Sequence, residues 1–293
     1  MSADRVLVTG AAGFTGGAAV DAALKLGLSV RAFVHADNAR AAALRARGIE
    51  VAIGDLSNID SVRGALEGVR SAYFVYPIRP GIIDATAYFA IAAKEAGVGA
   101  IVNMSQISAR RDSKSHAAQD HWVAERVVDW SGVPTTHLRP TFFAEWLIYP
   151  RSAEALSKEK RIAIPFGTGR HAPIAAEDQG RLIGHILADL APHAGETYKL
   201  FGPVEMDYYG IAAAVSGALG VDIAYTPISI DEFRRDLSEK QHYPPFLVQH
   251  LAEVAQDCRN GLFAGTNDVI ERVTGKPPMT VEAFISRHRQ AFA

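Results

Sequence analysis

The chain has 293 residues, long enough to bury a full-sized core as one large domain or as one domain with a smaller appendage. Its 30 lysine and arginine residues against 32 aspartate and glutamate residues leave a net charge of -2, so no basic surplus indicates nucleic acid binding. The single cysteine, Cys258, excludes an internal disulfide and has no companions for a metal site. We find neither a signal-peptide pattern nor an apolar run of the ~18 residues that a membrane span needs. We therefore expect a cytoplasmic protein, monomeric or homodimeric, that binds no nucleic acid, membrane or metal.

The first predicted strand, Val6–Thr9, leads into three glycines spaced three apart and then into a helix-like stretch. Gly10 permits a sharp turn, Gly13 lets backbone N–H groups approach a pyrophosphate, and Gly16 lets the helix pack closely on the strand. The strand before and the helix after favour a dinucleotide site over an ordinary turn. The predicted cofactor contacts of this turn are Gly10, Ala12, Gly13, Phe14, Thr15 and Gly16.

The second predicted strand, Ser29–Val34, ends without the carboxylate that usually binds the adenosine ribose of NAD. Arg31 and His35 share one face of this strand, and Arg40 follows nearby. We therefore expect these basic side chains to meet a 2′-phosphate, which favours NADP(H) over NAD(H). The alternative is that Arg31 and His35 are simply solvated.

The third predicted strand, Glu50–Ile53, is followed by Gly54-Asp55-Leu56. The Asp55 carboxylate is placed to accept a hydrogen bond from an adenine amino group, with Leu56 beside it. Its alternative role is a helix N-cap, although Ser57 and Asn58 are good caps themselves.

Short β-branched runs then continue to alternate with alanine-rich amphipathic runs. The further predicted strands are Ala72–Tyr76, Ala100–Met104 and Thr135–Leu138, and the helices lie near residues 16–26, 38–47, 59–66, 82–96 and 117–130. This order predicts an α/β fold with a doubly wound parallel (Rossmann) sheet, whose ligands bind beyond the carboxyl ends of the strands. Further cofactor contacts are expected there from Tyr76, Pro77, Met104, Ser105, Pro140 and Phe142.

Regular alternation ends near Pro150. We expect a dinucleotide-binding domain over residues 1–150 and a smaller, mostly helical substrate region over residues 151–293, from which segments could return to the sheet. Two short strands are predicted in this region, near Thr197–Leu200 and Asp222–Tyr225. The region is expected to cap the crevice of the sheet.

Several motifs together resemble the NmrA-like branch of the atypical short-chain dehydrogenases/reductases. These motifs are the glycine turn, Gly54-Asp55-Leu56, residues 131–140 (SGVPTTHLRP) and residues 273–278 (VTGKPP). The chain looks most like the bacterial NAD(P)H-dependent quinone, azo-dye and triphenylmethane reductases. The resemblance implies a cofactor more firmly than a reaction, because the branch also includes non-enzymatic NAD(P)-binding sensors.

The chain departs from the Tyr-x-x-x-Lys pair of the wider superfamily. Aligning Glu125 with the glutamate that often follows the lysine puts His121 at the lysine position and Ala117 at the tyrosine position. His121 is one candidate catalytic residue, because an imidazole can donate a proton near neutral pH. Its alternative is a surface histidine bonded to Glu125. Ser105 is the other candidate, with turn capping as its alternative.

Aromatic and polar side chains gather where a planar substrate is expected. The predicted substrate contacts are Tyr76, Gln106, Phe143, Trp146, Phe166 and Tyr243. Core packing is the alternative for these rings.

These residues predict an NADPH-preferring oxidoreductase that passes hydride to a flat aromatic acceptor such as a quinone or an azo or triphenylmethane dye. A second hypothesis is a non-catalytic NADP(H)-binding redox sensor that acts through a protein partner. A nucleotide-sugar isomerase or epimerase is disfavoured, because such relatives generally keep the tyrosine that Ala117 replaces.

Overall fold

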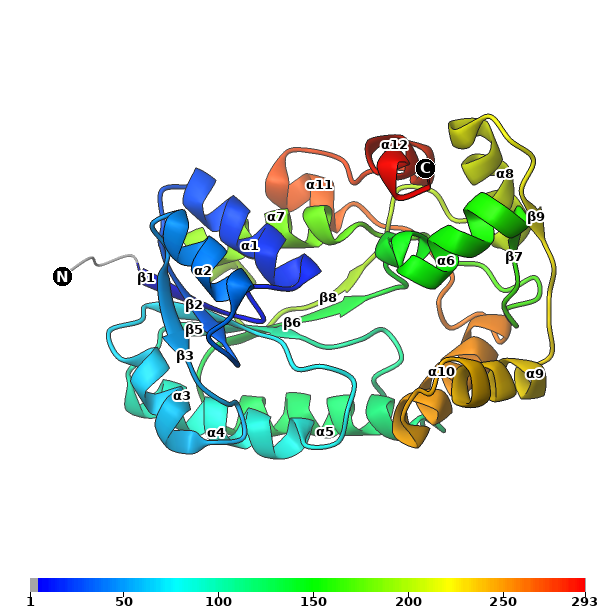
Figure 1. Ribbon diagram of the computed structural model, residues 1–293. Helices are drawn as coiled ribbons and strands as arrows, with labels where there is room; N and C mark the ends of the chain where they lie inside the picture. Colours follow the sequence, from blue (N-terminus) through cyan, green and yellow to red (C-terminus); the bar gives the residue numbers. More distant parts are fainter. Residues whose placement is uncertain (1–4, 293) are drawn as a thin grey trace. The chain divides into compact units, whose positions relative to one another are not determined.

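A seven-stranded sheet organises the computed structural model, which describes residues 5–292 (Figure 1). The strand order is β3-β2-β1-β4-β5-β6-β8, and the ladders that join β1 to β6 are all parallel. The strands are β1 (Arg5–Thr9), β2 (Ser29–Val34), β3 (Glu50–Ile53), β4 (Ser71–Phe74), β5 (Ala100–Met104), β6 (Thr135–Pro140) and β8 (Thr197–Leu200). The doubly wound parallel fold is therefore confirmed. The order reverses between β1 and β4, and ligands bind at such a switch point.

Helices cover both faces of this sheet (Figure 1). They are α1 (Phe14–Lys25), α2 (Ala39–Ala46), α3 (Ile59–Leu66), α4 (Ile82–Glu95), α5 (His116–Trp130) and α7 (Ala176–Ala188). The helix α1 packs along α7 on one face, and α3 packs against α4 on the other. Apolar side chains from β1, α3 and α4, including Leu7, Leu66 and Phe89, form a buried core beneath α3 and α4.

The chain divides into two units, and each is made of separate sequence segments. The first unit comprises the residues up to Arg111, Gln119–Arg139 and Ala176–Tyr198. The second comprises Asp112–Ala118, Pro140–Ala175 and the residues from Lys199 onward. The expected region 151–293 allowed segments to return to the sheet, and residues 176–198 lie in the first unit.

The second unit is mostly helical. Its elements are η1 (Ala144–Ile148), α6 (Pro150–Glu154), η2 (Ala155–Glu159), β7 (Arg161–Ile162), α8 (Tyr208–Leu219), β9 (Ala224–Tyr225), α9 (Ile230–Arg235), η4 (Asp236–Lys240), α10 (Pro245–Arg259), α11 (Val269–Thr274), α12 (Val281–Arg287) and η5 (Arg289–Phe292). A short 3₁₀ turn, η3 (Ala191–His193), precedes β8 in the first unit. The strands β7 and β9 pair with each other, whereas the strand predicted at Thr197–Leu200 joins the large sheet.

A short segment, Asp112–Ala118, is held within the second unit by hydrogen bonds to α10. Ser115 Oγ lies 2.8 Å from His250 Nδ1. The neighbouring Gln249 side chain donates to the Lys114 carbonyl at 2.8 Å and accepts from the His116 amide at 3.1 Å. Because Ser115 also accepts from the Ala118 amide, it caps the first turn of α5.

Candidate functional site

The turn between β1 and α1 has the geometry that its glycines predict. Gly10 adopts a φ of +59°, in the left-handed region that favours glycine. A Cβ at Gly16 would lie 2.1 Å from the Gly10 carbonyl oxygen, so only glycine fits there. Gly13 is the N-cap of α1 without a side-chain cap, and the first turn carries no acidic residue. The positive end of the α1 dipole is therefore suited to a phosphate.

A cavity of about 430 Å³ opens beside this turn, and all of its lining residues belong to the first unit. Predicted cofactor contacts that line it are Gly10, Ala12, Gly13, His35, Asp55, Leu56, Tyr76 and Pro77. Arg40, one of the basic side chains expected near a 2′-phosphate, also lines it. Lining residues that were not among the predicted contacts are Phe33, Val34, Ala36, Asn38, Gly54, Val75 and Arg79. The carboxyl ends of neighbouring strands thus converge as the fold requires.

Asp55 presents its carboxylate to this cavity. Hydrogen bonds from the amide and hydroxyl of Ser57, at 2.8 and 2.7 Å, hold the pKa of Asp55 below its usual value. His35 Nδ1 lies 3.6 Å from the other carboxylate oxygen. The alternative role of Asp55 as a helix cap is taken by Asn58, which accepts from the amides of Asp60 and Ser61. The Asp55 carboxylate is therefore ionised and partly exposed.

Arg31 is not brought to the cavity. It is buried in the middle of β2, where its guanidinium donates to the Glu50 carboxylate at 2.8 Å and to the carbonyls of Ala65 and Glu67 at 2.7 and 2.8 Å. Arg31 shares a strand face with His35, but this does not bring it to the cavity, because a separation of four residues along the strand places the two side chains ~13 Å apart. The structure gives Arg31 a structural role instead.

Two other arginines do line the cavity. The exposed Arg40 guanidinium makes no hydrogen bond or ion pair with the residues that the structure describes. Arg79 lies over the Tyr76 ring, 5.1 Å from its centroid, and donates to the Tyr76 hydroxyl at 3.2 Å. At this cavity the Arg40 guanidinium thus has no partner among the described residues, whereas Arg79 is held against Tyr76.

The other predicted residues of the first unit lie around the strand ends. Phe14 is exposed, whereas Thr15 is buried and accepts a hydrogen bond from Tyr73 at 3.2 Å. Met104 is the buried last residue of β5. Gln106 accepts from the Ser108 hydroxyl at 2.6 Å.

Ser105, which directly follows β5, is buried. Its hydroxyl makes no hydrogen bond with any residue from 5 to 292, although its backbone amide donates to Leu138. The hydroxyl therefore caps no turn, and its catalytic role stays a prediction.

His121 is also buried, with 5% of its surface exposed, so the alternative of a surface histidine is wrong. Glu125, one turn further along α5, is fully buried and accepts two hydrogen bonds from Arg139. The same bonds raise the pKa of Arg139. Glu125 is thus held in an ion pair with Arg139.

Most of the remaining predicted residues lie in the second unit, where an aromatic cluster gathers. We define this cluster as Phe142, Trp146, Phe166, His171, Tyr208 and Phe263. Phe142 stacks on Phe166 at 4.9 Å and on Phe263 at 4.3 Å, measured between ring centroids. Sequence reasoning missed His171, Tyr208 and Phe263, which come from distant parts of the chain.

Three predicted residues of this unit lie outside the cluster. Pro140 is buried at the end of β6. Phe143 is half-buried and forms a bridge with Ile174, and Tyr243 is exposed before α10.

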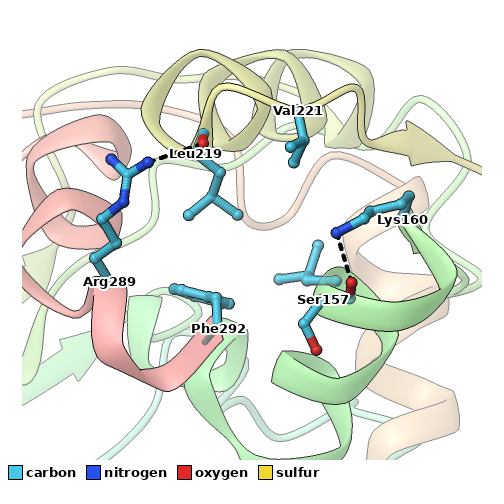
Figure 2. Close-up of a pocket in the computed structure, with 7 residues that line it drawn as sticks. Ser157, Lys160, Leu219, Val221, Arg289 and Phe292 are labelled. Atoms are coloured by element: carbon cyan, nitrogen blue, oxygen red, sulfur yellow. Dashed lines mark hydrogen bonds between the residues drawn. The ribbon is translucent and has the colours of Figure 1, made fainter.

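A second cavity, of about 190 Å³, lies in the second unit (Figure 2). The two basic side chains that line it donate hydrogen bonds at the ends of helices. Arg289 donates to the carbonyls of Ala218 and Leu219 at the end of α8, and Lys160 donates to the carbonyl of Ser157 in η2. Cations at these positions offset the negative ends of helix dipoles. Local structure therefore accounts for its charge.

No cluster of three or more metal-ligating side chains occurs within residues 5–292. The same residues contain no helix that is long and apolar enough to span a membrane.

A parallel doubly wound sheet with this glycine turn defines the class of NAD(P)-binding Rossmann proteins. The NmrA-like family model matches residues 2–285, and the chain belongs to that family. The NAD(P)H azoreductase of Xenophilus azovorans is 29% identical over 289 residues, which cover 98% of this chain and 99% of the azoreductase.

Solved structures share the fold. The NADPH-dependent quinone oxidoreductase of Escherichia coli, complexed with NADPH, has a TM-score of 0.85 and 25% identity, covering 97% of this chain and 99% of that one. The negative transcriptional regulator NmrA, in complex with NADP, has a TM-score of 0.79 and 19% identity, covering 98% and 95%. Both an enzyme and a regulator therefore use this architecture.

Proposed function

We propose that the protein is an NADPH-dependent reductase that transfers hydride to a flat conjugated acceptor, such as a quinone or an azo or triphenylmethane dye. The observation that carries this proposal is the cavity beside the glycine turn, because Gly13 at the start of α1, Arg40 and Asp55 all line it. The azoreductase and quinone oxidoreductase relatives support the acceptor class.

The residues of the first unit fit the cofactor. Because Gly16 has no Cβ, the first turn of α1 packs directly against the Gly10 carbonyl. This packing would leave the start of α1 open for the pyrophosphate. The Asp55 carboxylate is suited to accept a hydrogen bond from the adenine amino group. Arg40, with His35 beside it, would bind the 2′-phosphate, and this pairing favours NADPH over NADH. When bound, the reduced nicotinamide supplies the hydride.

The remaining roles fall to buried polar groups near the end of β5 and on α5. With a quinone or azo acceptor, the unpartnered Ser105 hydroxyl would donate a hydrogen bond to the atom where negative charge develops as hydride arrives. His121 would supply the proton that completes reduction of such an acceptor, whereas a triphenylmethane cation needs the hydride alone. Hydride transfer to a conjugated acceptor needs little further chemistry, because the acceptor itself carries the electron sink.

The test is to mix purified protein with NADPH and a panel of quinones and azo dyes and to follow the reduced-nicotinamide absorbance. We expect acceptor-dependent oxidation of NADPH. His121→Ala should lower kcat at least ~10-fold while the NADPH Kd stays unchanged. The matched control is His116→Ala, which alters an exposed histidine at the start of the same helix.

A redox sensor is the second candidate function. Ala117 and His121 in place of the Tyr-x-x-x-Lys pair favour it, because the usual acid of the superfamily is missing. Tight NADPH binding without turnover across the whole panel would support the sensor and count against the reductase.

A further inference from the structure

Arg79 is an exposed side chain that its neighbours hold in place at the cavity beside the glycine turn. Its Cζ lies 5.1 Å from the centroid of the Tyr76 ring, and its Nε donates to the Tyr76 hydroxyl at 3.2 Å. That hydroxyl in turn donates to the Pro80 carbonyl at 3.3 Å, and the Arg79 amide donates to the Pro77 carbonyl at 2.8 Å. The loop after β4 therefore positions the Arg79 guanidinium before any ligand binds.

Asp55 lines the same cavity just beyond the end of β3 and bears the opposite charge. After the hydrogen bonds from Ser57, the charges of His35 and Arg79 also contribute to the lowered pKa of Asp55. Although both belong to the described part of the chain, Arg79 and Asp55 share no hydrogen bond or ion pair. Their strands, β4 and β3, are separated in the sheet by β1 and β2, a distance of ~14 Å at ~4.8 Å between neighbours. The two charged groups thus face the cavity from opposite sides.

The two groups differ in the part of a ligand that each would contact. The Asp55 carboxylate only accepts hydrogen bonds, which suits the amino group on the edge of an adenine ring. A guanidinium is planar and stacks on aromatic faces, as Arg79 does with Tyr76. Because Arg79 is exposed, its guanidinium has surface left for a second ring. The edge and the face of one purine base therefore complement Asp55 and Arg79.

We propose that Arg79 stacks on the adenine base of the cofactor and, with Asp55 at the edge of that base, sets the preference of the chain for adenine dinucleotides. This inference rests on the proposed function, which supplies the cofactor. The 2′-phosphate is left to Arg40, which has no partner among the described residues.

The test measures the Kd of three dinucleotides in the wild type and in Arg79→Ala, with the fluorescence of the reduced nicotinamide as the signal. The dinucleotides are NADPH, NADH and reduced nicotinamide cytosine dinucleotide, which has the pyrophosphate of NADH and a smaller base. We expect Arg79→Ala to weaken NADPH and NADH alike by ~5- to 30-fold. The cytosine dinucleotide should lose less than ~3-fold, because its single ring offers less surface for stacking.

Arg63→Ala is the matched control. Arg63 is an exposed arginine of the first unit that bonds to Glu95 and does not line the cavity, so its variant should bind all three dinucleotides as the wild type does. Arg79→Tyr and Arg79→Lys separate stacking from charge. Arg79→Tyr keeps a planar group and should retain more NADPH affinity than Arg79→Lys, which keeps only the charge.

The inference is overturned if Arg79→Ala weakens NADPH alone, which would assign Arg79 to the 2′-phosphate. Equal losses for all three dinucleotides would assign it to the pyrophosphate and overturn the inference too, as would unchanged affinities or a better retention of NADPH by Arg79→Lys. If the wild type binds NADPH without reducing any acceptor and the affinities change as expected, the reductase fails and the inference stands. If the wild type binds none of the three, both fail.

Discussion

Two arginines that lie near each other in the sequence have opposite roles, because one is buried and the other is exposed. The Arg31 guanidinium donates hydrogen bonds to the Glu50 carboxylate and to two carbonyls at the end of α3. Arg40 stands on α2 at the cavity without a partner among residues 5–292. Charge type alone does not separate these roles, and the two residues call for different tests.

Arg40→Ala should weaken NADPH binding by about 10-fold, equivalent to ~1.4 kcal/mol, and leave NADH binding unchanged. The reason is that only NADPH carries the 2′-phosphate. Isothermal titration with both cofactors measures the difference. Arg45→Ala is the matched control, since Arg45 lies on the same helix but is paired with Asp37. Equal losses for NADPH and NADH would rule out the assignment.

Arg31→Leu should instead destabilise the fold by ~2–4 kcal/mol, because it leaves the buried Ala65 carbonyl without its hydrogen-bond donor and removes the ion pair with Glu50. Denaturant unfolding measures this loss. The preference of the folded protein for NADPH over NADH should stay as in the wild type. If the variant instead changed the preference for NADPH over NADH and kept the stability of the wild type, Arg31 would be a cofactor-binding residue after all.

At the scale of elements, the contact between α1 and the turn before it is tight. Gly16→Ala would bring a Cβ to 2.1 Å from the Gly10 carbonyl oxygen. We expect α1 to be displaced, NADPH binding to be lost, and stability to fall by ~3 kcal/mol, the upper end of the typical cost of overpacking. Gly17→Ala is the control, because its Cβ would lie at 3.5 Å from the nearest atom. Wild-type NADPH affinity in Gly16→Ala would refute the expected role of this turn.

The strands and helices of the first unit follow from local sequence. The predicted strands Ser29–Val34 and Ala100–Met104 and the helix 59–66 match the structure at both ends. Short apolar runs and helix-ending glycines mark these boundaries locally. The glycine turn and the position of Asp55 could likewise be predicted from the sequence, because their geometry depends on residues that are close in the chain.

Other features depend on contacts between distant residues, which no local pattern encodes. The aromatic cluster joins Phe142 to Phe263, more than a hundred residues apart, and so was predicted only in part. The one available signal for His171 was a lone histidine before an apolar run, which is also typical of a core histidine. The return of Ala176–Tyr198 to the first unit likewise depends on the packing of α7 on α1.

At the scale of the whole molecule, two buried histidines link stability to pH. Burial lowers the pKa of His171 to about 3 and that of His250 to about 4, both below the ordinary value of 6.5. The folded protein therefore binds fewer protons than the unfolded chain below pH 6.5, and stability is present above that pH and is lost as the pH falls toward 4.

We expect the free energy of unfolding to decrease by up to ~1.4 kcal/mol per pH unit for each histidine in this window. Denaturant unfolding at pH 7, 6, 5 and 4.5 measures the slope, and His171→Phe should remove about half of it. Partly exposed carboxylates such as Asp55, whose pKa is also lowered, titrate below this range. An identical slope in the wild type and in His171→Phe would contradict the linkage.

The interleaving of the two units also has a consequence for synthesis on the ribosome. The helix α1 packs against α7, which emerges about 150 residues later, and β8 completes the sheet only when residue 200 has been made. Until then a nascent chain displays an apolar helix face and an unpaired strand edge, which invite aggregation. Neither unit is therefore complete until late in synthesis. A gene fragment that stops at residue 150 encodes only part of each unit.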